Sequence, residues 1–287
     1  MMETQTCAGL VSALEGRAAF YDVVAALYYK PLAQEQIDRI AEGGLAAFAG
    51  AGELMAEGLH DMERALSKRH SGTRQELAVD FTGAFAGTSS WKGRYATPYE
   101  SVFTSEEGLL FQDSYHEVYR LYRQNSVRKS PGYDFPDDHL SYLCEFQALL
   151  ARRAVRSLEA NDAECALEQG RLSQHVLHDH ILSWFDDFEE LALHLVKTRF
   201  YRGVLKMSKG FFLFDAEVLA DMAEELESYD VRAGARMHGC RLLRAAQPPQ
   251  SLPDGVLRGG PARGRRLRGG DVLGHAPRRM ERVLRSY

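Results

Sequence analysis

The hydrophobic positions of this chain recur at helical spacing through most of its first 230 residues. One helical face consists of Leu10, Leu14, Ala18, Tyr21, Ala25 and Tyr28, which follow one another at steps of three or four before Pro31. The same spacing predicts further helices over 33–48, 51–69, 73–86, 114–124, from after Pro136 to about 158, 162–178, 180–212 with a break, and 215–228. No run alternates apolar and polar residues with β-branched enrichment, so we expect an all-α fold built as a single multi-helix globular domain.

Two stretches interrupt the helical pattern. Residues 87–105 contain Gly, Ser, Thr and Pro98, and residues 126–136 read SVRKSPGYDFP. Such residues favour turns and disfavour long helices, so both stretches are predicted to be loops.

The composition is that of an ordinary globular protein. Of the 287 residues 45% are hydrophobic and 26% are charged, which excludes collagen-like, mucin-like and wholly disordered chains. No stretch reaches the roughly 18 uninterrupted apolar residues of a membrane span, and the first residues lack the basic region of an export signal. The four cysteines form no CxxC pair, so free thiols and a cytoplasmic protein are expected.

The charge is distributed unevenly along the chain. Residues 241–287 contain eleven Arg, no Lys and three acids, a net charge of +8, so residues 1–240 carry −13 of the overall −5. The same 47 residues hold five of the nine prolines and seven glycines. We therefore predict a helical domain over 1–240 and a basic, low-complexity, disordered tail over 241–287. The acidic domain favours a cationic partner and argues against nucleic acid as the main ligand.

Two clusters have the chemistry of a binding site. Asp137 and Asp138 stand beside His139 at a predicted helix start, where two carboxylates could bind a guanidinium bidentately. The alternative is a helix cap. In the loop ATPYESVFTSE, apolar residues surround the acid Glu100; they either fold the loop onto the core or line a groove for an apolar peptide.

A third cluster offers an enzymatic alternative. His175, His178 and Asp179 share one helix face, while His180 points elsewhere. Metal-dependent phosphohydrolases of the HD type use such a His-Asp pair, here His178-Asp179, and His139 and Asp215 would have to supply the missing ligands. Histidines that pack and cap a helix junction explain the cluster as well. No nucleotide-binding loop, nucleophile elbow or zinc motif occurs, so the sequence favours a binding protein, for which we expect no metal or cofactor.

Five segments occur in an order that matches a known family: ELAVDFTGAF (76–85), ATPYESVF (96–103), FPDDHLSYLCEF (135–146), HDHILSWFDDF (178–188) and FYRGVLKMSKGFF (200–212). In these segments the chain resembles the TorD/DmsD/NarJ-like family of redox-enzyme maturation chaperones over about residues 8–230. The resemblance does not cover the Arg-rich tail. It implies an all-helical, non-catalytic, cytoplasmic chaperone.

The resemblance also implies a partner and a site. The expected partner is the twin-arginine signal peptide of a molybdopterin-containing oxidoreductase in its apo form, bound while cofactor is inserted and before export by the Tat translocon. The site would comprise Phe81, Phe85, Pro98, Tyr99, Glu100, Asp137, Asp138 and His139. Phe81 and Ala84 stand where some members carry larger groups, which affects the depth of the groove. A monomer and a dimer with swapped helices both remain open.

Overall fold

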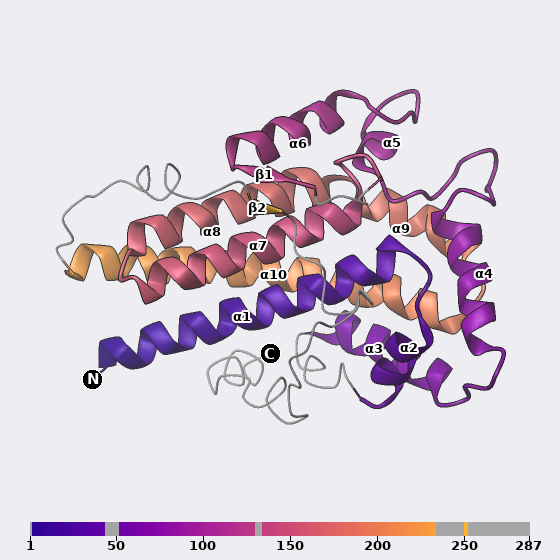
Figure 1. Cartoon of the computed structure of the whole chain (residues 1–287), viewed down its shortest axis with the longest axis horizontal. Coiled ribbons are helices and arrows are strands. Elements are labelled where there is room, and N and C mark those ends of the chain that lie inside the picture. The colour runs from indigo at the N-terminus through magenta and orange to yellow at the C-terminus, as the bar shows by residue number, and fades with distance from the viewer. Residues whose placement is uncertain (1, 44–51, 130–133, 234–249, 252–287) are drawn as a thin grey trace. The chain divides into compact units, whose positions relative to one another are not determined.

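The computed structural model describes residues 2–43, 52–129, 134–233 and 250–251 of the chain. The helices are α1 (Met2–Tyr29), α2 (Gln34–Ala41), α3 (Glu53–Leu66), α4 (Thr73–Phe85), α5 (Glu100–Thr104), α6 (Asp113–Gln124), α7 (Leu140–Glu159), α8 (Ala163–Leu177), α9 (Ser183–Leu195) and α10 (Arg199–Ala233), with a π-helical turn at His178–Leu182 (Figure 1). The predicted all-α fold is confirmed. Among the residues described, no helix is both long enough and apolar enough to cross a membrane.

Three predictions of local structure are wrong. The loop predicted over 87–105 contains the short helix α5. The break predicted within 180–212 is present between α9 and α10, at residues 196–198, but the predicted helix end at 212 is wrong, because α10 continues through Asp215 as one 35-residue helix. Helix α7 begins at Leu140, so Asp137 and Asp138 precede the helix, whose first turn contains no acid.

Side-chain caps set several helix starts. Asp162 caps α8, where its carboxylate accepts a hydrogen bond from Cys165 N at 2.9 Å. The Asp80 carboxylate accepts hydrogen bonds from the backbone of Lys197 and Thr198, both at 2.8 Å, just before α10 begins. Each cap satisfies amide groups that have no partner within the helix itself.

The described residues form two compact units. The first comprises residues 2–25, 99–129, 134–184, 215–233 and 250–251. In it α1, α7, α8 and the C-terminal part of α10 run alongside one another (Figure 1). A buried network joins them: the Arg17 guanidinium donates to the Asp215 carboxylate at 2.5 and 2.8 Å and to the Ser173 hydroxyl at 3.0 Å.

The second unit comprises residues 26–43, 52–98 and 185–214. Its core is aromatic, with Phe85 between Tyr28, Phe81 and Tyr201 at ring-centroid distances of 5.3, 5.5 and 5.6 Å. Edge-to-face packing of this kind stabilises a core beyond simple burial of apolar area.

Most of the predicted tail over 241–287 lies outside the described residues. Within it, β2 (Gln250–Ser251) pairs in parallel with β1 (Val127–Arg128), Val127 opposite Gln250 and Arg128 opposite Ser251. The division into a domain over 1–240 and a tail therefore stays a prediction. Cys144 is a free, buried thiol, but Cys165 is disulfide-bonded, so the expectation of free thiols is wrong for Cys165.

Candidate functional site

The start of α5 is joined directly to the residues that precede α7. Tyr99 and His139 form an antiparallel backbone bridge, and Glu100 N donates to the carbonyl of Asp138 at 3.2 Å. A second hydrogen bond joins the same two segments: the Asp138 carboxylate accepts from Ser101 N at 2.9 Å. Five of the eight residues predicted for the site are thereby brought together in the first unit: Tyr99, Glu100, Asp137, Asp138 and His139.

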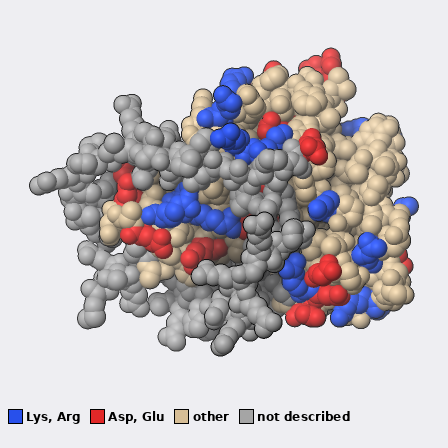
Figure 2. Space-filling model, viewed as in Figure 1, with Lys and Arg blue, Asp and Glu red and all other residues tan. Residues whose placement is uncertain are grey.

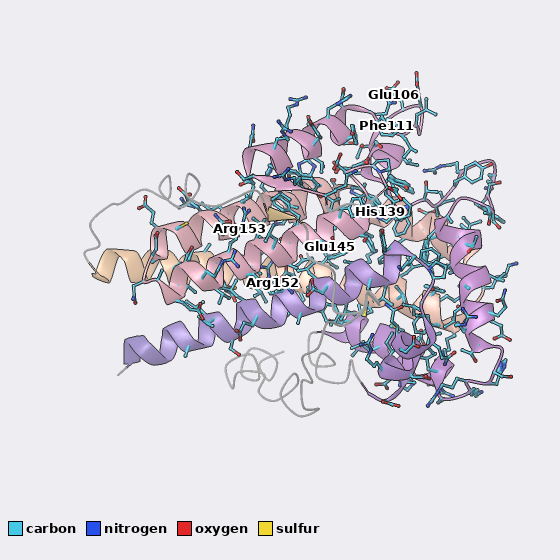
Figure 3. The ribbon with its side chains drawn as sticks, viewed as in Figure 1. Glu106, Phe111, His139, Glu145, Arg152 and Arg153 are labelled. Atoms are coloured by element: carbon cyan, nitrogen blue, oxygen red, sulfur yellow. The ribbon has the colours of Figure 1, made fainter. Side chains whose placement is uncertain are left out.

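His139 is the N-cap of α7 (Figure 3). Its Nδ1 accepts a hydrogen bond from Ser141 N at 3.1 Å, so the neutral ring carries its proton on Nε2. The ring stacks on Phe135 at 4.6 Å and meets Tyr99 edge to face at 4.9 Å. The capping alternative is therefore correct for His139, which also belongs to an aromatic group beside the two acids.

Asp138 has no exposed surface. One carboxylate oxygen accepts from Ser101, and the other, Oδ1, has no hydrogen-bond partner among the described residues. Burial raises the pKa of Asp138, and burial followed by the charge of Asp138 raises the pKa of Tyr99 to about 12. A buried carboxylate with an unsatisfied oxygen favours a bound donor.

Asp137 is 7% exposed and lies next to a cation. Its Oδ1 is 3.5 Å from Lys129 Nζ, and that ammonium also donates to the carbonyl of Phe135 at 2.6 Å. Lys129 further lies over the ring of Tyr142, 5.6 Å from its centroid. In this part of the site, Lys129 therefore lies between the carboxylate of Asp137 and the ring of Tyr142.

Glu100 is buried and paired with a histidine. Its carboxylate oxygens lie 3.0 and 3.1 Å from Nδ1 of His180. Burial raises the pKa of Glu100 to about 7, although the His180 hydrogen bond opposes the shift. Burial alone would lower the pKa of His180, but its hydrogen bond to Glu100 and the charge of Glu100 raise it.

The other three predicted residues, Phe81, Phe85 and Pro98, belong to the second unit. Phe81 and Phe85 are each 4% exposed and form part of its aromatic core. The structure therefore brings the two phenylalanines together as packing residues. Their role in binding stays a prediction.

Comparison with known proteins identifies the family. Residues 50–190 match the family described as "Nitrate reductase delta subunit". The chain is 25% identical to the "Chaperone protein TorD" of Vibrio vulnificus (strain YJ016) over 211 residues, 71% of this chain and 95% of that protein. It is 30% identical to the same-named protein of Psychrobacter sp. (strain PRwf-1) over 152 residues, 52% of this chain and 64% of that protein.

These matches support a TorD-like family of chaperones for this chain. The resemblance found in the order of the five sequence segments is confirmed.

The metal-site alternative is not assembled in this TorD-like structure. Asp179 is exposed and pairs with His175 at 2.5 Å, while Asp215 accepts hydrogen bonds from Arg17 and Tyr21. Within the described ranges, no three His, Cys, Asp or Glu side chains are grouped so that they could hold a metal ion. His180 pairs with Glu100, but its ring also lies 5.3 Å from that of His175, so the prediction that it points away from the His175–Asp179 pair is wrong.

Sequence reasoning missed two features of the site. It treated His180 as a packing residue, although the motif HDH places a third ionisable group beside the His-Asp pair. It also missed that Tyr119 is 44% exposed, whereas Val118 and Tyr122 of the same helix are buried. The run Leu109-Leu110-Phe111 after Gly108 was the available signal for an exposed apolar surface.

Proposed function

We propose that this TorD-like chain binds the twin-arginine signal peptide of a molybdopterin-containing oxidoreductase and assists its maturation before Tat export. The family supports a chaperone. Asp138 supports the peptide as ligand, because its buried carboxylate has one oxygen without a hydrogen-bond partner in the described residues. A guanidinium supplies parallel N–H donors in the geometry that a carboxylate accepts.

Asp137 is the contact that an incoming arginine meets first in this proposal. The Lys129 ammonium pairs with Asp137 in the absence of the peptide, with Nζ 3.5 Å from Oδ1. An ammonium is a point charge, whereas a guanidinium binds a carboxylate through two parallel hydrogen bonds, so arginine replaces Lys129 favourably. The adjacent Asp138 then receives the second arginine or the remaining donors of the first.

The apolar part of the peptide would pack against the aromatic group around His139. Tyr99 and Phe135 contact this ring at centroid distances of 4.9 and 4.6 Å. Apolar contacts persist at high salt, whereas pairing of exposed charges is screened over about 8 Å at physiological ionic strength. A role of Phe81, Phe85 and Pro98, which belong to the second unit, in peptide binding stays a prediction. The chaperone names of the relatives support a protein without catalytic activity, and we propose that it acts in the cytoplasm.

Isothermal titration calorimetry with a synthetic peptide tests the proposal. The peptide carries two adjacent arginines followed by an apolar segment. We expect binding that weakens with salt and falls about tenfold or more in Asp137→Asn, because a charge-assisted contact is lost. Glu159→Gln is the matched control, since it removes an exposed carboxylate at the opposite end of α7 and leaves the affinity unchanged.

The peptide supplies the decisive comparison. If replacing both of its arginines by alanine leaves the affinity unchanged, the charge-pairing account is wrong. Asp138→Asn is a poorer first test, because the Asp138 carboxylate also holds Ser101 N and its loss affects folding.

A further inference from the structure

An apolar surface is exposed between α5 and α6 and on the first half of α6. Leu109, Leu110, Phe111 and Tyr119 are 52%, 38%, 55% and 44% exposed. Tyr115 joins them, with its ring 5.0 Å from that of Phe111 and 6.5 Å from that of Tyr119. Figure 3 shows Phe111 in the loop before α6, close to Glu106. These five residues are called the LLF surface below.

The backbone holds this surface outward at a cost. Phe111 has a φ of 62°, in the left-handed region that residues other than glycine rarely adopt. Gly108, at the same φ, begins the turn. A large apolar side chain that is kept exposed in a disfavoured backbone conformation indicates a contact that the rest of the fold does not provide.

The stretch that carries most of the LLF surface is acidic. Residues 106–119 contain the exposed acids Glu106, Glu107, Asp113 and Glu117 and no Lys or Arg, although Arg120 and Arg123 follow them on α6. Both acidic and basic side chains lie at the top of the face in Figure 2. Burial and then the charge of Asp137 raise the pKa of Tyr115. The complementary ligand is therefore both apolar and basic.

Such a segment exists in the chain itself. Residues 252–287 contain nine Arg, no Lys and three acids, a net charge of +6. Their arginines adjoin apolar residues, as in Val256-Leu257-Arg258, Arg265-Arg266-Leu267-Arg268 and Arg282-Val283-Leu284-Arg285. On α6, Arg123 already lies over the ring of Tyr119, 6.0 Å from its centroid, which is the contact an arginine of this segment would repeat on the neighbouring rings.

The strand pairing fixes the residues that precede this segment, Gln250 and Ser251, beside β1. After α6 the chain turns at Asn125 and Ser126, and β1 runs back along α6 (Figure 1). Because β2 is parallel to β1, the chain that leaves Ser251 is directed toward the first half of α6. Tyr115 lies nine residues before the end of α6, about 14 Å along the helix axis. Six extended residues span about 20 Å, so the chain from Leu257 onward is long enough to reach the surface.

We propose that residues 252–287 dock on the LLF surface of the same chain. The apolar residues would cover the exposed rings, and the arginines would pair with the exposed acids of residues 106–119. The LLF surface meets the proposed peptide site at Tyr115, which interacts with Asp137, but its exposed apolar side chains and its tether are its own.

Photo-crosslinking in the full chain tests the contact. Phe111 is replaced by p-benzoyl-phenylalanine, and mass spectrometry identifies the crosslinked residues. We expect crosslinks to residues 252–287 within one chain, with a yield that does not depend on protein concentration. The yield should fall about fivefold in the variant with Arg265→Gln, Arg266→Gln and Arg268→Gln, and also at about 1 M salt, because charge pairing is lost or screened.

The same probe at Val79, which is 58% exposed in the second unit, is the control, and its crosslinks should not depend on the tail arginines. If the Phe111 variant fails to fold, the probe at Leu109 repeats the test. The proposal is overturned if the crosslinks join two copies of the chain, if they reach only another protein, if they are absent, or if the arginine substitutions leave the yield unchanged.

Discussion

Glu100 and His180 form an ionisable pair inside the first unit, 2% and 4% exposed. The main chain fixes both partners, since Glu100 N donates to Asp138 and His180 O accepts from Trp184 Nε1 at 2.7 Å. Glu117 and Asp179 add negative charge, and the ring of His175 lies 5.3 Å from that of His180. Burial of both groups makes a single shared proton the stable state of the pair.

This pair should make stability depend on pH. The folded-state pKa of Glu100 is raised from 4.5 to about 7, and that of His180 is raised above 6.5. Raised values mean that the stabilisation is complete below pH 4.5 and is lost as pH rises through about 7. We expect the free energy of unfolding to fall by about 1–3 kcal/mol more in the native chain than in Glu100→Gln over this window. Urea unfolding at a series of pH values measures it.

An exposed acid of the same region provides the control. The free energy of unfolding of Glu107→Gln should depend on pH as that of the native chain does. Glu107 is exposed, so its substitution does not change the titration of a buried group. If Glu100→Gln shows the same pH slope as the native chain, the pair does not titrate in this window.

Glycines decide how closely two helices of the second unit approach. A Cβ on Gly203 of α10 would lie 2.6 Å from the carbonyl oxygen of Gly58 and 2.9 Å from Met62 N on α3. A Cβ on Gly210 would lie 2.5 Å from Met55 N. The contacting atoms are backbone, which cannot move aside as the end of a side chain can. The helices therefore cross at a distance that only glycine permits.

Gly203→Ala should be strongly destabilising for this reason. We expect a loss of about 2–3 kcal/mol, because overpacking forces α3 away from α10. Gly170→Ala on α8 is the matched control: a Cβ there meets nothing within 4 Å, and removal of a helical glycine should add about 0.5–1 kcal/mol. Denaturant unfolding of the two variants measures the expected loss of stability in Gly203→Ala and the expected gain in Gly170→Ala. Equal effects would show that α3 and α10 move apart at little cost in free energy.

The helical spacing of apolar residues predicted most helices but not the segments that connect them. The apolar stripe of α1 was readable because its period is intrinsic to the sequence. Helix α5 was missed because five residues are too few to show a period, and its start depends on Asp138, 37 residues away. The break expected before residue 215 is absent because Asp215 is held inside the unit by Arg17 and Tyr21. Long-range partners of this kind have no local signature.

The candidate site was predictable to a similar extent. The segments PYES and PDDHL were located correctly as one group in space. The sequence could not show that Glu100 is paired with His180, because 80 residues separate them. Nor could it show that Phe81 and Phe85 are core residues of a different unit.

At the scale of the whole first unit, one buried network joins four helices drawn from distant parts of the chain. Arg17 of α1 pairs with Asp215 of α10, and Tyr21 donates to the same carboxylate at 2.6 Å. Gln147 of α7 donates to the Ser173 carbonyl of α8 at 2.9 Å, and the Ser173 hydroxyl donates to the Gln147 side chain. A cooperative unit results, because no member can leave without exposing a buried partner.

Removal of both ion-pair partners should therefore cost less than the sum of the losses from removing each one. Arg17→Met leaves the Asp215 carboxylate buried without its cation, and we expect a loss of about 3–5 kcal/mol. Asp215→Leu should cost a similar amount, because it leaves a buried guanidinium. The double variant should be more stable than the sum of the two losses predicts, by about 2 kcal/mol or more, since neither charge remains. Denaturant unfolding of the four proteins completes the cycle; strictly additive losses would mean that the two side chains stabilise the unit independently of each other.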